Sequence, residues 1–168
     1  MEIYPKRIIF IFLLTLLSKF SFGQTTAISD RIDVKFPSDP EKQQVGSKMF
    51  YMVIESNYVV TVMFADMSQE PNFDIKPDSL SRFYKGVING TLAAATDSKL
   101  LDERTIQVGQ FEGKEIKYTK DFNGADDILV TKWILLVDKA VYTFDFWNLS
   151  GKEQKELEEE FFKSIVVK

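Results

Sequence analysis

Residues 128–147 read ILVTKWILLVDKAVYTFDFW and hold two apolar segments separated by Asp138 and Lys139. Residues 128–137 are apolar at nearly every position, which is typical of a central strand covered on both faces. Residues 140–147 are rich in aromatic and β-branched side chains, as strands are. Because two turn-forming residues separate the segments, the pattern predicts an antiparallel strand pair.

Working outward, the same kinds of pattern predict more strands. We expect them at residues 32–36, 47–54, 58–65, 100–108 and 114–122. Asn123-Gly124 is a strong hairpin signal, because both residue types tolerate positive φ. It predicts that the strand at 114–122 pairs antiparallel with the strand at 128–137.

Two segments have the apolar period of a helix. In the first, which begins at Pro77, an apolar stripe is formed by Leu80, Phe83, Tyr84, Val87, Ile88 and Leu92. Gly86 and Gly90 in this helix predict that it approaches the sheet closely. In the second, Ser150 and Glu153 form a capping box that opens a helix ending near Ile165. The fold class expected is α+β, an antiparallel sheet of about six to seven strands with a helix on each face.

The N-terminal segment has the features of a leader. Lys6 and Arg7 precede an apolar run at residues 8–17, which is shorter than the roughly 20 residues that span a bilayer. Ser21-Phe22-Gly23 matches a signal-peptidase site. The sequence therefore predicts a signal peptide at 1–23, a single domain at 24–168, and a periplasmic or secreted protein without stable membrane insertion after cleavage. An uncleaved anchor is the alternative.

Composition excludes several kinds of chemistry. The 168-residue chain has no histidine and no cysteine, so disulfides, zinc–thiolate sites and Ser-His-Asp triads cannot form. The formal net charge is −4, and beyond the leader the only arginines are Arg31, Arg82 and Arg104, scattered along the chain. Such a chain lacks the basic surface that nucleic acids bind. We expect no catalytic residue, no metal, no cofactor and no nucleic-acid partner.

The candidate ligand-binding residues are Asp145, Trp147, Asn148 and Ser150. Alternation places Asp145 and Trp147 on one face of their strand, and Ser150 would open a helix whose free N–H groups can hold a polar ligand group. The alternatives are that Asp145 is exposed or paired with a lysine, and that Trp147 packs under the second helix. Trp133 is expected in the core.

One acidic segment needs a separate interpretation. Residues 121–127, DFNGADD, bring oxygen ligands together but depart from the EF-hand pattern, since Ala125 and Asp126 occupy its fifth and sixth positions. A polar hairpin tip is the favoured interpretation, with a weak calcium site as the alternative.

Several motifs carry a resemblance to a known superfamily. They are residues 103–109 (ERTIQVG), 113–116 (GKEI), 142–146 (YTFDF) and 161–164 (FFKS). With them the chain resembles the PsbP-like superfamily, which includes an extrinsic protein of photosystem II and exported bacterial proteins of unknown role. The resemblance covers most of residues 30–168 and implies the fold only.

Three functions are compatible with the sequence. The one expected is an exported, non-catalytic binding or accessory protein of the cell envelope, whose partner is an unknown protein or small molecule. A hydrolase that uses two carboxylates is an alternative, recognisable by two carboxyl groups about 5–9.5 Å apart in a pocket. A structural or assembly partner in an envelope complex is another, recognisable by a large apolar surface patch.

Overall fold

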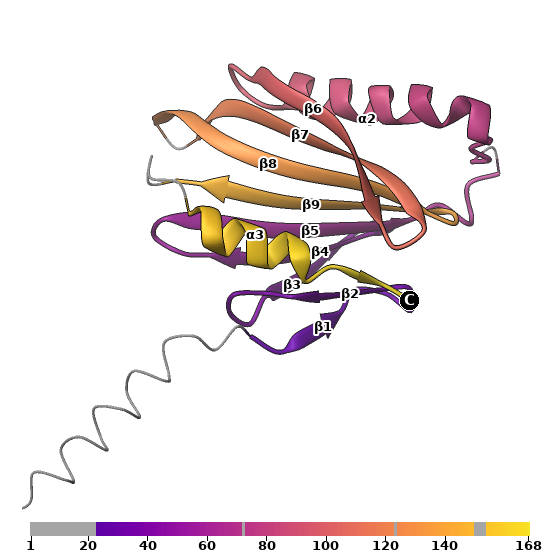
Figure 1. The fold of residues 1–168 in the computed structure, drawn as a ribbon, viewed down its shortest axis with the longest axis horizontal. Helices are drawn as coiled ribbons and strands as arrows, with labels where there is room; N and C mark the ends of the chain where they lie inside the picture. The colour runs from indigo at the N-terminus through magenta and orange to yellow at the C-terminus, as the bar shows by residue number, and fades with distance from the viewer. Residues whose placement is uncertain (1–22, 72, 123, 150–153) are drawn as a thin grey trace, which may run out of the picture.

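The centre of the molecule is a seven-stranded antiparallel sheet (Figure 1). The structure is a computed structural model and describes residues 23–71, 73–122, 124–149 and 154–168. In spatial order the strands are β3 (Glu41–Val45), β4 (Lys48–Ile54), β5 (Tyr58–Asp66), β9 (Ala140–Asn148), β8 (Ala125–Val137), β7 (Phe111–Phe122) and β6 (Lys99–Val108). The predicted α+β class and antiparallel sheet are confirmed.

The hairpin between β8 and β9 sets the register at the middle of the sheet. Val137 pairs with Ala140 across the two-residue turn, in which Asp138 has a φ of 54°. On the other side of β8, the strands β7 and β8 pair antiparallel, as the Asn123-Gly124 pattern predicts. Gly124 has a φ of 79°, which glycine adopts without strain. Asn123 lies outside the described residues.

Helix α2 (Leu80–Ala94) follows a short 3₁₀ turn, η2 (Pro77–Ser79), and packs over β7 and β8. Its Tyr84 is buried, and the Tyr84 hydroxyl donates to the Glu112 carbonyl at 2.7 Å and accepts from the Leu136 N–H at 3.2 Å. Burial raises the pKa of Tyr84. The helix is thus attached to the sheet through a polar anchor as well as an apolar stripe.

The two glycines of α2 do not mark a close approach to the sheet, so that expectation is wrong. A Cβ built on Gly86 or Gly90 meets no atom within 4 Å. The helix instead packs through Tyr84 and Ile88, and both glycines lie on its exposed side. They leave open space beside the helix.

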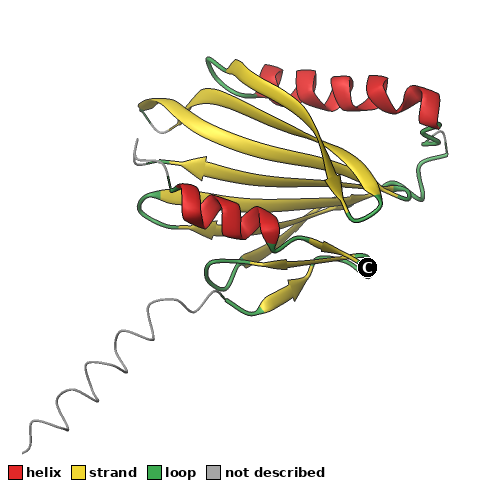
Figure 2. Cartoon of the chain, viewed as in Figure 1, coloured by secondary structure: helices red, strands yellow, loops and turns green. Residues whose placement is uncertain are grey.

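Helix α3 (Lys155–Lys163) packs against the opposite face of the main sheet (Figure 2). Its Phe161 is completely buried and lies 6.5 Å from Phe146, and Phe162 stacks on Trp133 with ring centroids 4.7 Å apart. Trp133 is therefore part of the core, as expected. Gln154 stands at the N-cap position and makes no capping side-chain hydrogen bond; the predicted capping pair, Ser150 and Glu153, lies outside the described residues.

A second, three-stranded sheet lies beside α3. It has the order β1 (Thr25–Ala27), β2 (Ile32–Lys35) and β10 (Val166–Val167). The strand predicted at residues 32–36 belongs to this small sheet and not to the main sheet. The edge of the main sheet is formed instead by β3.

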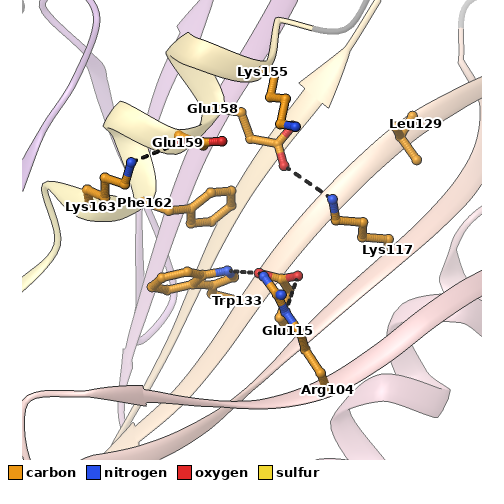
Figure 3. Close-up of a pocket in the computed structure, with 10 residues that line it drawn as sticks. All are labelled: Arg104, Glu115, Lys117, Leu129, Trp133, Lys155, Glu158, Glu159, Phe162 and Lys163. Atoms are coloured by element: carbon orange, nitrogen blue, oxygen red, sulfur yellow. Dashed lines mark hydrogen bonds and ion pairs between the residues drawn. The ribbon is translucent and has the colours of Figure 1, made fainter.

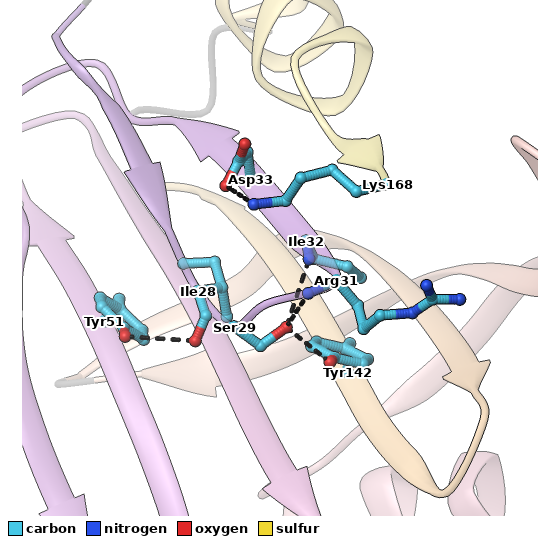
Figure 4. A network of polar contacts seen from close by, with 8 residues as sticks. All are labelled: Ile28, Ser29, Arg31, Ile32, Asp33, Tyr51, Tyr142 and Lys168. Carbon is cyan, nitrogen blue, oxygen red and sulfur yellow. Dashed lines mark hydrogen bonds and ion pairs between the residues drawn. The ribbon is translucent and has the colours of Figure 1, made fainter.

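Polar contacts join the small sheet to the main sheet (Figure 4). Ser29 and Tyr142 share a hydrogen bond of 2.8 Å between their hydroxyls, and the Tyr51 hydroxyl donates to the Ile28 carbonyl at 3.4 Å. Within the small sheet, Lys168 after β10 forms an ion pair with Asp33 of β2 at 2.9 Å. The loop before β2 is thereby fixed to β9 and β4.

The predicted leader, apart from Gly23, lies outside the described residues. Within the part of the chain that is described, no helix combines the length and apolar character needed to cross a membrane.

Candidate functional site

The structure divides the four predicted site residues. Asp145 and Trp147 lie on β9 and face the side of the sheet that carries α2. Asn148 points to the opposite face, because successive side chains of a strand alternate in direction and Asn148 directly follows Trp147. Ser150 lies outside the described residues. Trp147 does not pack under α3; its ring contacts Phe122, 5.2 Å away in an edge-to-face arrangement.

Asp145 and Trp147 line a groove between the end of α2 and the main sheet. One side is formed by the last turns of the helix, at Gly90, Thr91, Ala94 and Ala95. The floor is formed by side chains of five strands, namely Lys48, Phe50, Thr61, Met63, Tyr118, Lys120, Lys132, Thr143, Asp145 and Trp147. The volume is about 610 Å³, which falls in the range of small-molecule sites. We call this cavity the α2 groove.

Asp145 is the buried centre of the α2 groove. Its Oδ1 lies 3.1 Å from the ammonium of Lys132, in an ion pair that lacks hydrogen-bond alignment, and its Oδ2 accepts a hydrogen bond of 3.1 Å from the hydroxyl of Thr61. The side chains of Asp145 and Lys132 are both only 11% exposed. Removing either charge would leave the other buried without compensation, so each group depends on its partner. The pair links the strands β8 and β9 in the floor of the groove.

Lys120 and Trp147 form the adjoining wall of the groove. The Lys120 ammonium lies 3.3 Å from the centroid of the Trp147 ring, a cation–π contact, and 5.5 Å from that of Phe122. Burial lowers the pKa of Lys120, Asp145 acts in the opposite sense, and Lys132 lowers it further. Lys120 is thus a partly desolvated cation on an aromatic surface.

Tyr118 lies beside Lys120 in the same lining. Burial raises its pKa, and the nearby Asp145 carboxylate adds to the effect, so the phenol stays protonated at neutral pH. It contributes an aromatic face and a hydroxyl that can donate.

A second hollow lies on the other face, between α3 and strands β6, β7 and β8 (Figure 3). Its volume is about 520 Å³. At its base, the carboxylate of Glu115 is held by Arg104, with contacts of 2.7 Å from Nε and 2.8 Å from Nη2, and by the indole N–H of Trp133 at 2.6 Å.

Most of the charges in this second hollow are paired. Hydrogen bonding to Glu115 raises the pKa of Arg104. Lys117 faces Glu158 at 3.9 Å, and Lys163 pairs with Glu159 at 2.9 Å. Because the Glu115 carboxylate contacts both Arg104 and Trp133, we interpret this cluster as a structural link between Trp133 and the edge strand β6.

Lys132, Lys120 and Thr61 are site residues that the sequence reading missed. A signal for Lys132 was present: a two-residue turn at Asp138-Lys139 fixes a register in which Lys132 stands directly opposite Asp145, as observed. The paired alternative for Asp145 could therefore have named its partner. Thr61 had no such signal, because the pairing of β5 with β9 is not set by a turn.

A metal site is not found at either hollow. Among the described residues, no three acidic side chains lie close enough together to hold a metal ion. In the acidic segment 121–127, for which a weak calcium site is the alternative to a hairpin tip, Asn123 and the Asp126 side chain lie outside what the structure describes.

Comparison with solved structures bears on the fold. Cyanobacterial PsbP (CyanoP) from Synechocystis sp. PCC 6803 superposes with a TM-score of 0.58 and 14% identity, over 86% of this chain and 92% of that one. The chain has a PsbP-like fold. A protein from Bacteroides thetaiotaomicron VPI-5482 is also similar, with a TM-score of 0.54 and 12% identity, over 88% of this chain and 49% of the other.

Sequence comparisons are less informative. No protein-family model matches the chain, and no curated protein matches it. At these identities the likeness concerns the fold alone, so the function must be argued from the side chains of this chain.

Proposed function

We propose that the protein is an exported, non-catalytic binding protein of the cell envelope, and that it holds a small molecule in the α2 groove. The observation that carries the proposal is the groove itself, a concavity of about 610 Å³ with the nearly buried Lys132–Asp145 pair at its base. Apolar concave sites with a few fixed polar groups are typical of ligand binding. The leader-like N-terminal sequence supports export.

The hydrolase alternative fits the groove less well. Two carboxyl groups are needed, one as acid and one as base or nucleophile. Among the described residues the groove is lined by one carboxylate, Asp145, and that group is already engaged by Lys132 and Thr61. A general acid or base must be free to exchange a proton with the substrate.

The assembly alternative also has less support. The most exposed large apolar residues are Val45, Ile54, Leu100, Leu101 and Val166, and they lie on four different strands. Only Leu100 and Leu101 are neighbours. Single exposed apolar residues are normal on protein surfaces, whereas a docking surface requires a contiguous patch.

The helix glycines allow a sharp test. Gly90 lines the groove and Gly86 does not, yet both have open space where a side chain would go. Gly90→Phe should fill the groove without disturbing the core, and Gly86→Phe is the matched control. Native mass spectrometry of the protein purified from its own cells should show a bound small molecule in the wild type and in Gly86→Phe, and its loss in Gly90→Phe.

Other outcomes favour the alternatives. A molecule retained equally by both variants would exclude the groove as the site. Recovery of a cleaved product would support the hydrolase. Trp147→Leu, with the fold checked by circular dichroism, should also weaken binding, because it removes the aromatic wall.

A further inference from the structure

The charge inside the α2 groove is opposite to that of the whole protein. Lys48, Lys120 and Lys132 line it together with one acidic residue, Asp145, whereas the chain carries a formal net charge of −4. Field lines concentrate in a concave site with low-dielectric walls, so this local excess of positive charge selects for anions.

Of these lysines, Lys120 is the one placed to receive an anion. Lys132 is neutralised by Asp145 at 3.1 Å. Lys120 makes no ion pair with any described residue, and its ammonium lies instead on the face of Trp147. A partly desolvated ammonium without a carboxylate partner gains a charge-assisted hydrogen bond when an anionic oxygen arrives.

The lining of the α2 groove includes flat and apolar side chains. Trp147, Tyr118 and Phe50 contribute rings to the lining, and Met63 contributes a flexible apolar side chain. In addition, the indole N–H of Trp147 is buried and has no hydrogen-bond acceptor among the described residues. An unsatisfied buried donor makes this wall unusual, because most buried polar groups have a partner.

We propose, building on the function proposed above, that the ligand of the α2 groove is a small organic anion with a flat apolar body, whose anionic group binds Lys120 and whose body lies against Trp147 and Tyr118. The anionic group is a carboxylate, sulfonate or phosphate. This assignment names the class of ligand, and it is independent of which compound the cells supply.

A matched pair of fluorescent probes tests the assignment. 1-Anilinonaphthalene-8-sulfonate carries a flat apolar body and one sulfonate, and N-phenyl-1-naphthylamine has the same body without the charge. With the full folded protein, the sulfonate should bind at least about tenfold more tightly, the gain of one charge-assisted hydrogen bond of about 1.4 kcal/mol. Lys120→Met should remove this preference, and Lys120→Arg should largely preserve it.

The control is Lys117→Met, which removes a lysine from the same strand but on the opposite face. It should leave the binding of both probes unchanged. If both probes bind equally and Lys120→Met has no effect, while Gly90→Phe abolishes binding of both, the anion assignment is wrong and the groove remains the binding site. If Gly90→Phe affects neither probe, the groove itself is excluded and both proposals fall. If neither probe binds the wild type, the ligand class is wrong, and the mass-spectrometric test decides on the groove.

Discussion

The two faces of the main sheet use the same strands but are covered to different extents. On the α3 face, the helix and the small sheet enclose a layer of aromatic rings in which Phe36, Phe144, Phe146 and Phe161 are almost completely buried. On the other face, α2 covers β7 and β8, and polar groups such as Thr143 and Asp145 are buried beside an open groove. We infer that the α3 face supplies stability and that the α2 face is available for binding.

The largest expected difference in stability is between two variants that each truncate one side chain, one on each face of the sheet. Phe161→Ala removes a fully buried ring from the α3 face and should destabilise the protein by about 3–5 kcal/mol. Met63→Ala removes a partly buried side chain from the groove and should cost only about 1 kcal/mol, since no closed cavity is left. Urea unfolding curves measure both, and equal losses would contradict the division of roles.

The buried ion pair gives the second effect. Asp145→Leu leaves the Lys132 ammonium nearly buried without its partner and should destabilise by about 3 kcal/mol. The double variant Asp145→Leu with Lys132→Met removes both charges and should recover most of that loss. A double-mutant cycle from urea unfolding measures the coupling. Additive losses would show that the two charges do not depend on each other.

Alanine substitutions at two glycines, one on each face, should change the stability by smaller amounts and in opposite directions. A Cβ on Gly113 would collide with the side chain of Leu135 and approach the Ile134 carbonyl to 2.7 Å, so Gly113→Ala should destabilise by about 1–3 kcal/mol. Gly90→Ala meets open space in a helix and should stabilise by up to about 1 kcal/mol. Thermal unfolding of the two variants checks the signs; a loss at Gly90 would mean that the groove is narrower than described.

The smallest expected effect concerns pH. Because burial lowers the pKa of Lys120, the unfolded chain holds more protons than the folded one at pH values between the folded and unfolded pKa. Stability therefore rises with pH across that window. Below the window Lys120 is charged and desolvated, which lowers the stability of the folded protein. The other ionisable groups of the groove are the same in the wild type and in the Lys120→Met variant described next, so they do not cause a difference between the two. These groups are Lys48, Tyr118, Lys132 and Asp145.

Lys120→Met should remove this pH dependence and should be slightly more stable than the wild type at neutral pH. Urea unfolding at about pH 7 and about pH 11, on either side of the window that ends at the ordinary lysine pKa, measures it. Lys117→Met is the control, because it should leave the slope with pH as it is. A wild type whose stability falls between these two pH values, relative to Lys120→Met, would contradict the assigned sign.

Much of the fold was predictable because apolar periodicity and turn chemistry were consistent with each other. The strands at 47–54, 58–65 and 128–137 and the helix after Pro77 follow directly from these patterns. The strand β3 was missed for a physical reason: it is an edge strand whose five residues, EKQQV, are all exposed, so no alternation marks it. The strand β10 is too short to show a period.

The candidate site was predicted only in part. Alternation correctly grouped Asp145 with Trp147, and the same alternation would have excluded Asn148 from their face. Lys120 could not be chosen from sequence alone, since its importance arises from the rings around it and from the opening left by α2. The glycines were misread because an exposed helix surface and a close helix contact both accommodate glycine.

The pairing of β2 with β10 has a consequence for how the chain acquires its structure. Asp33 pairs with Val166, so this contact closes a loop of roughly 130 residues, for which the entropic penalty is about 4 kcal/mol in an unfolded chain. The small sheet is therefore completed only after the main sheet has shortened that loop. During synthesis, the apolar residues around β2 emerge early and lack their final neighbours until α3 and β10 have been made. These residues are Ile32, Val34 and Phe36. Over that interval they are a natural target for chaperones that recognise exposed apolar segments.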